Sequence, residues 1–117
     1  MRGTDSGWRI VWLGVCPWAV AGCTAPLPAS FDAPDAGSRI RAVVASTEQP
    51  TLEALEGMVA GLGSDDPALR TLSIAALERT AGARFGYDPW AAESDRRTAI
   101  GRWRRWLETQ APPVAEP

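Results

Sequence analysis

Few residues in this 117-residue chain have the chemistry needed for catalysis or metal binding. The chain has no histidine, which is the commonest general base and the commonest metal ligand. Its two cysteines lie near the N-terminus, and its only adjacent acids are Asp65 and Asp66. Adjacent acids at the start of a predicted helix usually cap that helix and interact with its dipole. We therefore expect a protein that is not an enzyme and has no catalytic residue, metal site or cofactor.

Cys23 is the residue for which the sequence most clearly predicts a chemical modification. Two arginines precede an apolar run over residues 10–20, which is too short to cross a bilayer and is typical of a signal peptide. The run ends in the tetrapeptide Val-Ala-Gly-Cys, which resembles the lipobox of bacterial lipoproteins. In that family the chain is cleaved before the cysteine and lipid is attached to its sulfur. The resemblance implies that Cys23 is the lipidated first residue of the mature protein.

This interpretation divides the chain into four parts. Residues 1–22 are then a lipoprotein signal peptide, 23–34 a flexible, proline-rich tether, 35–110 a helical domain and 111–117 a disordered tail. The expected location is a bacterial cell membrane or outer membrane, to which the exported chain is anchored by its lipid. The alternative for the tether is an arm laid on the domain, for which Phe31 is the only support.

Two other interpretations of the N-terminus stay open. The signal could be cleaved elsewhere, or Cys23 could form a disulfide with Cys16. An intact N-terminus would instead leave an unanchored or signal-anchored helical adaptor that binds a protein partner inside the cell.

Arginines interleaved with tryptophans form a candidate binding site near the C-terminus. Such a pattern can stack on bases and neutralise phosphates. Nucleic-acid binding is nevertheless disfavoured, because the formal net charge is −2, acids lie among the arginines, and exported proteins seldom meet nucleic acid. The same arginines could contact anionic lipid headgroups or an acidic partner, or could keep the domain soluble. The candidate binding residues in this segment are Arg97, Arg104 and Arg105.

A short aromatic segment, residues 84–90, precedes these arginines. The favoured interpretation is a loop whose rings fold back over the open end of the core, because aromatic rings bury a large area. The other interpretation is a surface for a ligand or partner, formed by Tyr87 and Trp90. We treat both residues as candidate contacts.

A helix predicted over residues 66–81 has to position these segments. Asp66 is a suitable N-cap, Pro67 suits the first helical position, and Gly82 suits the left-handed residue after the end. Its apolar face is broad enough to require neighbouring helices on two sides. The residues expected on or beside the buried face are Leu69, Leu72, Ile74, Ala76, Leu77 and Thr80.

Apolar residues at helical spacing predict three further helices, over residues 35–46, 50–62 and 93–109. Gly57 should weaken the second of them by about 1 kcal/mol relative to alanine. The expected fold class is therefore all-α, with about four helices stacked as antiparallel hairpins after the signal segment.

The turn into the central helix also carries a family resemblance. An apolar helix, the segment Asp-Asp-Pro-Ala-Leu-Arg and a second helix with small residues resemble the HEAT repeat, the two-helix unit of α-solenoids. In that family the Asp-Pro pair turns the chain and the following arginine ties turns together. The matching residues, to which the resemblance assigns structural roles, are Asp66, Pro67 and Arg70. Arg70 also follows Asp66 by four residues, a spacing that allows an ion pair.

The HEAT resemblance covers about residues 50–82. Together with the lipobox it implies a small HEAT-like lipoprotein that acts as an interaction or scaffold module of the cell envelope. Its expected partners are the membrane, through Cys23, and a protein of unidentified type.

Overall fold

The computed structural model describes residues 28–112 of the chain. Within this range the protein has four α-helices and no β-strand, which confirms the predicted all-α fold class. The predicted signal peptide, Cys16 and Cys23 lie outside the described residues. The helix bounds are α1 (Ala36–Ala45), α2 (Leu52–Gly61), α3 (Pro67–Ala81) and α4 (Glu93–Gln110).

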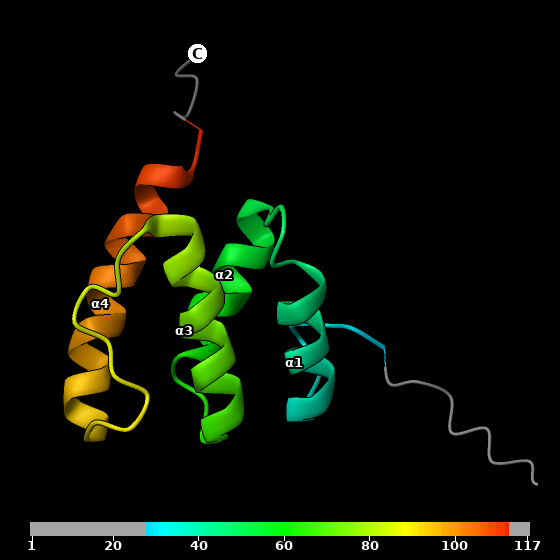
Figure 1. The fold of residues 1–117 in the computed structure, drawn as a ribbon, viewed down its shortest axis with the longest axis horizontal. Coiled ribbons are helices and arrows are strands. Elements are labelled where there is room, and N and C mark those ends of the chain that lie inside the picture. Colours follow the sequence, from blue (N-terminus) through cyan, green and yellow to red (C-terminus); the bar gives the residue numbers. More distant parts are fainter. Residues whose placement is uncertain (1–27, 113–117) are drawn as a thin grey trace, which may run out of the picture.

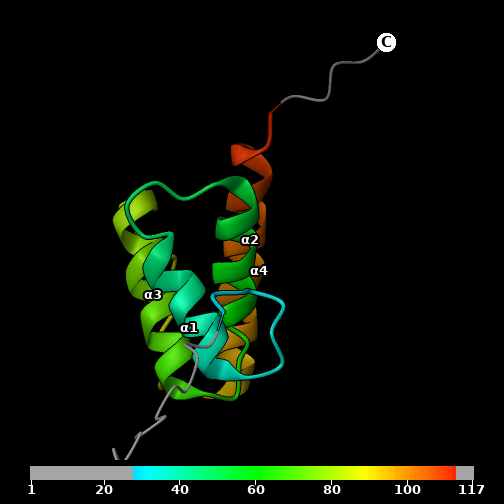
Figure 2. The same ribbon diagram turned by 90° about the vertical axis from the view of Figure 1, so that its right-hand side faces the viewer.

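The four helices form two layers (Figures 1 and 2). Helices α1 and α3 lie side by side in one layer, and α2 packs beneath both of them and beside α4. Helix α2 runs antiparallel to each of its three neighbours, as Figure 1 shows. Helix α4, however, runs parallel to α3. Residues 82–92 lead the chain from the end of α3 back to the level of its start, where α4 begins. The last connection is therefore a crossover and not a short hairpin turn.

Local capping accounts for where the first three helices begin. Asp35, Thr51 and Asp66 each accept a hydrogen bond from a backbone N–H in the first turn of the following helix. Pro67 occupies the first position of α3, where a missing N–H costs no helical hydrogen bond. Gly82 ends α3 with a left-handed backbone (φ 72°), a conformation that glycine adopts without strain. These start and stop signals depend only on neighbouring residues.

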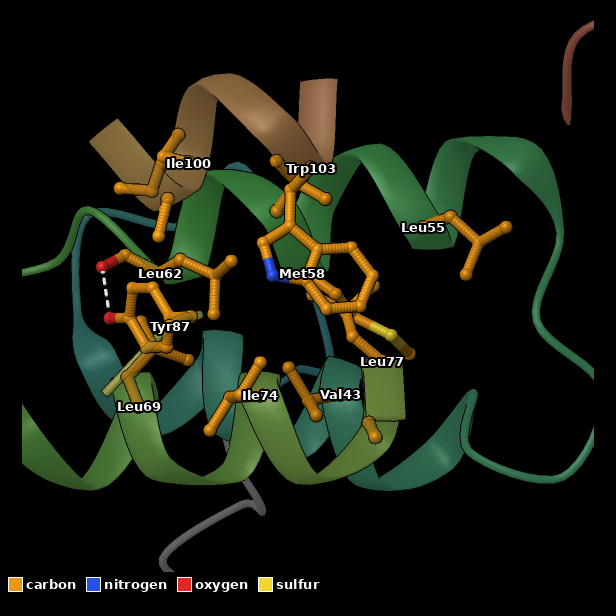
Figure 3. Close-up of a cluster of buried hydrophobic side chains, with 13 residues drawn as sticks. Val43, Leu55, Met58, Leu62, Leu69, Ile74, Leu77, Tyr87, Ile100 and Trp103 are labelled. Carbon is orange, nitrogen blue, oxygen red and sulfur yellow. Dashed lines mark hydrogen bonds between the residues drawn. The ribbon is translucent and has the colours of Figure 1, made fainter. Parts of the chain in front are cut away.

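The core lies between the two layers and is centred on α2 (Figure 3). Helix α4 adds the ring of Trp103, which is fully buried and packs edge-on against Phe85 at a centroid distance of 4.7 Å. This geometry is favourable for aromatic pairs. The largest apolar side chains that are almost completely buried are Val43, Met58, Leu62, Leu69, Ile74, Leu77 and Trp103.

The buried face of α3 differs from the predicted one. Leu72 is 37 % exposed and Thr80 is also exposed, so the prediction that both are buried is wrong. The centre of the face instead includes the polar side chain of Ser73, which lies against Gly61 of α2 at a point where a larger side chain would not fit. The four apolar members of this face were predicted to be buried, but a search for apolar periodicity misses Arg70 and Ser73 because they are polar. Its members are Leu69, Arg70, Ser73, Ile74, Ala76 and Leu77.

The end of the predicted tether is part of the domain. The Phe31 ring packs against the core over Gly57, and the backbone N–H of Ser30 donates a hydrogen bond of 3.2 Å to the carbonyl oxygen of Ser38. The predicted tether boundary at residue 34 is therefore wrong, because one aromatic ring and one backbone hydrogen bond hold this segment on the helices. Gly57 is the residue that makes room for the ring.

Two glycine substitutions test this packing. Gly101→Ala in α4 should stabilise the protein by about 0.5–1 kcal/mol, because alanine has the higher helix propensity and the added methyl group would only reach van der Waals contact with Arg105 Nη1 at 4.0 Å. Gly57→Ala should be destabilising, because its methyl group would overlap the Phe31 ring.

The measurement is urea unfolding of each variant. In a Phe31→Ala background, Gly57→Ala should recover the stabilisation seen at position 101. A Gly57→Ala variant that is stabilised while Phe31 is present would contradict the observed packing.

Candidate functional site

Arg70 joins three parts of the chain through one buried guanidinium group. Only 9 % of the residue is exposed. Its Nε donates to the carbonyl oxygen of Pro89 at 3.0 Å, and its Nη1 donates to the carbonyl oxygens of Ser64 and Asp65 at 2.8 and 3.0 Å. The group thus ties α3 to the α2–α3 turn and to the loop before α4. The spacing had also allowed an ion pair with Asp66, but the Asp66 carboxylate is engaged in capping α3.

The crossover loop, residues 82–92, is held by donors from α4 as well as by Arg70. Trp103 Nε1 donates to the carbonyl oxygen of Arg84, and Arg102 Nη1 to that of Phe85, both at 3.1 Å. Arg96 Nη1 donates to the carbonyl oxygen of Ala91 at 2.7 Å. Since these bonds are distributed along the loop, they fix its path between α3 and α4.

Tyr87 is part of the interior and not of the surface. It is 2 % exposed, and its hydroxyl group donates a hydrogen bond of 2.6 Å to the carbonyl oxygen of Leu62 (Figure 3). Its burial agrees with the favoured interpretation of the aromatic segment, in which the rings fold back on the core. The other interpretation, that Tyr87 contacts a partner, is wrong because the ring fills the space between α2 and α3. Burial raises the pKa of the Tyr87 phenol above its usual range.

Trp90 has the opposite environment, with 71 % of the residue exposed. Its backbone is nevertheless held in place, since its N–H donates to Asp88 Oδ1 at 2.9 Å and the neighbouring Pro89 carbonyl accepts from Arg70. A large ring on a fixed backbone can contact a partner without a large loss of backbone entropy. Trp90 thus stays a candidate contact.

A cleft of about 450 Å³ lies between the α2–α3 turn and the first three turns of α4. We call it the arginine cleft. Ile100, which is 7 % exposed, provides an apolar patch in it. The cleft is lined by Gly63, Asp65, Glu93, Arg96, Arg97, Ile100 and Arg104.

The charges in the arginine cleft are only partly paired. Arg97 forms an ion pair with Glu93 one turn earlier on α4, and Arg96 is hydrogen-bonded to the crossover loop. Arg104 forms no hydrogen bond or ion pair with any residue in the range 28–112. Three cations and two carboxylates give the cleft a formal charge of +1, although the whole chain has a net charge of −2.

The structure brings together two of the three arginines predicted to bind a partner. Arg97 and Arg104 line the cleft because they are seven residues apart, which is two helical turns. Arg105 is exposed but is not part of the cleft, since it follows Arg104 by about 100° around the helix axis. Arg96 and Asp65 were not among the predicted binding residues. Arg96, Ile100 and Arg104 are four residues apart, so their spacing could have predicted that they share one face of the helix. No local sequence pattern predicts that Asp65 lies beside them.

Residues 28–112 contain no group of three or more acids, cysteines or histidines placed to hold a metal ion. None of the four helices in this range combines the length and the apolar character needed to cross a bilayer. No protein-family model, curated protein or solved structure matches the chain.

Tyr87 provides a prediction about stability at high pH. The chain has one tyrosine and no lysine, so Tyr87 is the only group in the domain whose ordinary pKa lies near 10. Above about pH 10 the unfolded chain releases the phenolic proton, whereas the folded chain retains it because its pKa is raised. The free energy of unfolding should therefore decrease as the pH rises above about 10.

Tyr87→Phe should remove this pH dependence. At neutral pH the same substitution should lower the free energy of unfolding by about 1–3 kcal/mol, because the buried Leu62 carbonyl loses its donor. Urea titrations at pH 7 and above pH 10 measure both effects. An equal alkaline slope in the wild type and in Tyr87→Phe would contradict a buried, hydrogen-bonded phenol.

Proposed function

We propose that this protein is a non-catalytic interaction module that binds an acidic segment of a protein partner in the arginine cleft. The observation that carries the proposal is the convergence of Arg96, Arg97 and Arg104 around Ile100 at the edge of a fixed framework. The module is tethered to the cell envelope by lipid on Cys23. Its α2–α3 hairpin serves as a HEAT-like structural unit.

The chemistry of arginine favours an acidic ligand. A guanidinium group is permanently charged and presents its donors in a planar fork that matches a carboxylate. It cannot exchange protons near neutral pH, so it is suited to binding and not to acid–base catalysis. The guanidinium N–H groups of Arg104 donate to no residue in the range 28–112. Arg104 is therefore the cleft residue best able to form charge-assisted hydrogen bonds with the carboxylate of a ligand.

The composition of the cleft favours one acidic side chain within a peptide over a polyanion. Asp65 and Glu93 would repel a continuous run of phosphates, but Asp65 can accept a hydrogen bond from a peptide N–H. Ile100 adds an apolar contact for an aliphatic part of the same ligand. The exposed Trp90 ring, three residues before Glu93, supplies additional area for the partner.

The anchor is supported by the N-terminal sequence. An apolar run too short to span a bilayer, followed by Val-Ala-Gly-Cys, fits lipid attachment at Cys23. Residues 24–29 would then separate the lipid from Ser30 and Phe31, which pack on the domain. This short spacing holds the domain near the membrane surface. It raises the local concentration of the module for partners on the same membrane.

Adjacent arginines provide a matched test of the cleft. Arg104→Ala should weaken binding of a fluorescein-labelled peptide with a single glutamate beside an aliphatic residue by about tenfold, since it removes a charge-assisted hydrogen bond. Arg105→Ala removes the same charge from the next residue of α4 and should change the affinity less than about twofold. Fluorescence anisotropy at physiological salt measures both affinities. Equal losses in the two variants would indicate attraction by net charge and would contradict a specific cleft.

Lipid attachment is tested separately by mass spectrometry of the full chain expressed in bacteria. The mature protein should begin at Cys23 and carry the mass of its acyl groups. Cys23→Ser should abolish the lipid and release the chain from the membrane fraction, whereas Cys16→Ser should leave processing unchanged. A product that retains Met1 would contradict the anchor and support an intracellular adaptor.

A further inference from the structure

A second surface of the molecule lies on the outer side of the α1–α3 layer, away from the arginine cleft. Here the two helices form a furrow of about 330 Å³, which we call the α1–α3 furrow. Val44 and Leu72, which line it, are 60 % and 37 % exposed. Besides Trp90, they are the only exposed large apolar side chains in residues 28–112. The furrow is lined by Val43, Val44, Thr47, Glu48, Leu72, Ala75, Ala76 and Arg79.

We propose that the α1–α3 furrow is the interface of a homodimer, in which a second copy of the chain packs the same furrow face to face. The proposal goes beyond the function proposed above and does not rest on it, because no residue of the arginine cleft belongs to this surface.

The charges at the furrow identify the second copy as the occupant. Glu48 and Arg79 lie on its two sides, with Arg79 Nη2 3.9 Å from Glu48 Oε1, and both side chains are largely exposed. Helices α1 and α3 run in the same direction (Figure 1). A two-fold axis along the furrow therefore places α1 of one copy opposite α3 of the other at the same height. Each Glu48 then faces an Arg79 of the second copy, so the surface is complementary to itself.

The apolar residues fit the same arrangement. Val44 precedes Glu48 by four residues and Ala75 precedes Arg79 by four, so both lie about one helical turn from the charged pair. The axis along the furrow places the exposed Val44 side chain over Ala75 and Ala76 of the second copy. Small residues at this point let the helices approach closely, and the larger side chain fills the space between them. Charges at the rim of such an interface select the partner more than they add affinity.

Charge exchange tests the proposal with the full-length protein as isolated. The wild type should sediment as a dimer, and Glu48→Arg or Arg79→Glu should each weaken dimerisation at least tenfold, because each leaves like charges opposed. An equimolar mixture of the two variants should form dimers again. In the mixed dimer the introduced arginine of one variant faces the introduced glutamate of the other, and the two unchanged residues form the second pair. Sedimentation velocity measures all four samples.

Dimer formation in the mixture would show that Glu48 and Arg79 pair across the interface, because the ion pair within one chain stays broken in both variants. Both single variants should keep the wild-type thermal unfolding profile at low protein concentration, because the exposed pair adds little to the stability of one copy. Val44→Asp should abolish the dimer, whereas Ala45→Asp, an exposed neighbour on α1, should leave it intact. Arg104→Ala should also leave it intact, which keeps this test independent of the arginine cleft.

A wild-type protein that is monomeric up to about 100 μM would overturn the proposal. A mixture of Glu48→Arg and Arg79→Glu that stays monomeric would overturn it as well. So would a monomeric wild type whose furrow is covered by a different protein.

Discussion

The buried guanidinium group of Arg70 is the interaction on which the arrangement of this domain depends. It donates hydrogen bonds to carbonyl oxygens of the α2–α3 turn and of the crossover loop. Two of these acceptors, Ser64 and Pro89, are 25 residues apart in the chain. Backbone carbonyls without a donor are costly to bury, and a planar cation with several donors can satisfy more than one of them. Arg70 thereby converts two irregular segments into fixed parts of the structure. A lysine could not replace it, because its single ammonium group lacks the planar fork.

The crossover loop in turn positions α4. Its carbonyl oxygens accept hydrogen bonds from Arg70 on one side and from Arg96, Arg102 and Trp103 on the other. Tyr87 closes the space between the loop and α2 with its hydroxyl on the Leu62 carbonyl. Helix α4 can then lie on α2 in the direction that brings its first turns beside Asp65. The arginine cleft exists because of this direction, since its acidic wall comes from the turn and its basic wall from α4.

The domain thus has two surfaces of different character. The arginine cleft is polar, lies at the start of α4 and contains a cation that residues 28–112 leave unpaired. The α1–α3 furrow is apolar and has one charge of each sign at its side. A dimer formed through the furrow would leave both clefts open, so that two acidic segments could be bound at once. Two linked binding sites increase the overall affinity for a partner that carries repeated acidic segments.

The sequence alone determined the features that depend on nearby residues. The helices begin and end close to their predicted bounds because caps such as Asp66, with Pro67 and Gly82, act within one turn. The shared cleft position of Arg97 and Arg104 also follows from helical spacing. Only the tertiary structure decided whether Tyr87 is buried, whether Leu72 is exposed and which way α4 runs. These outcomes depend on contacts between residues far apart in the chain, such as Tyr87 with Leu62 and Arg70 with Pro89, and local periodicity contains no information about such pairs.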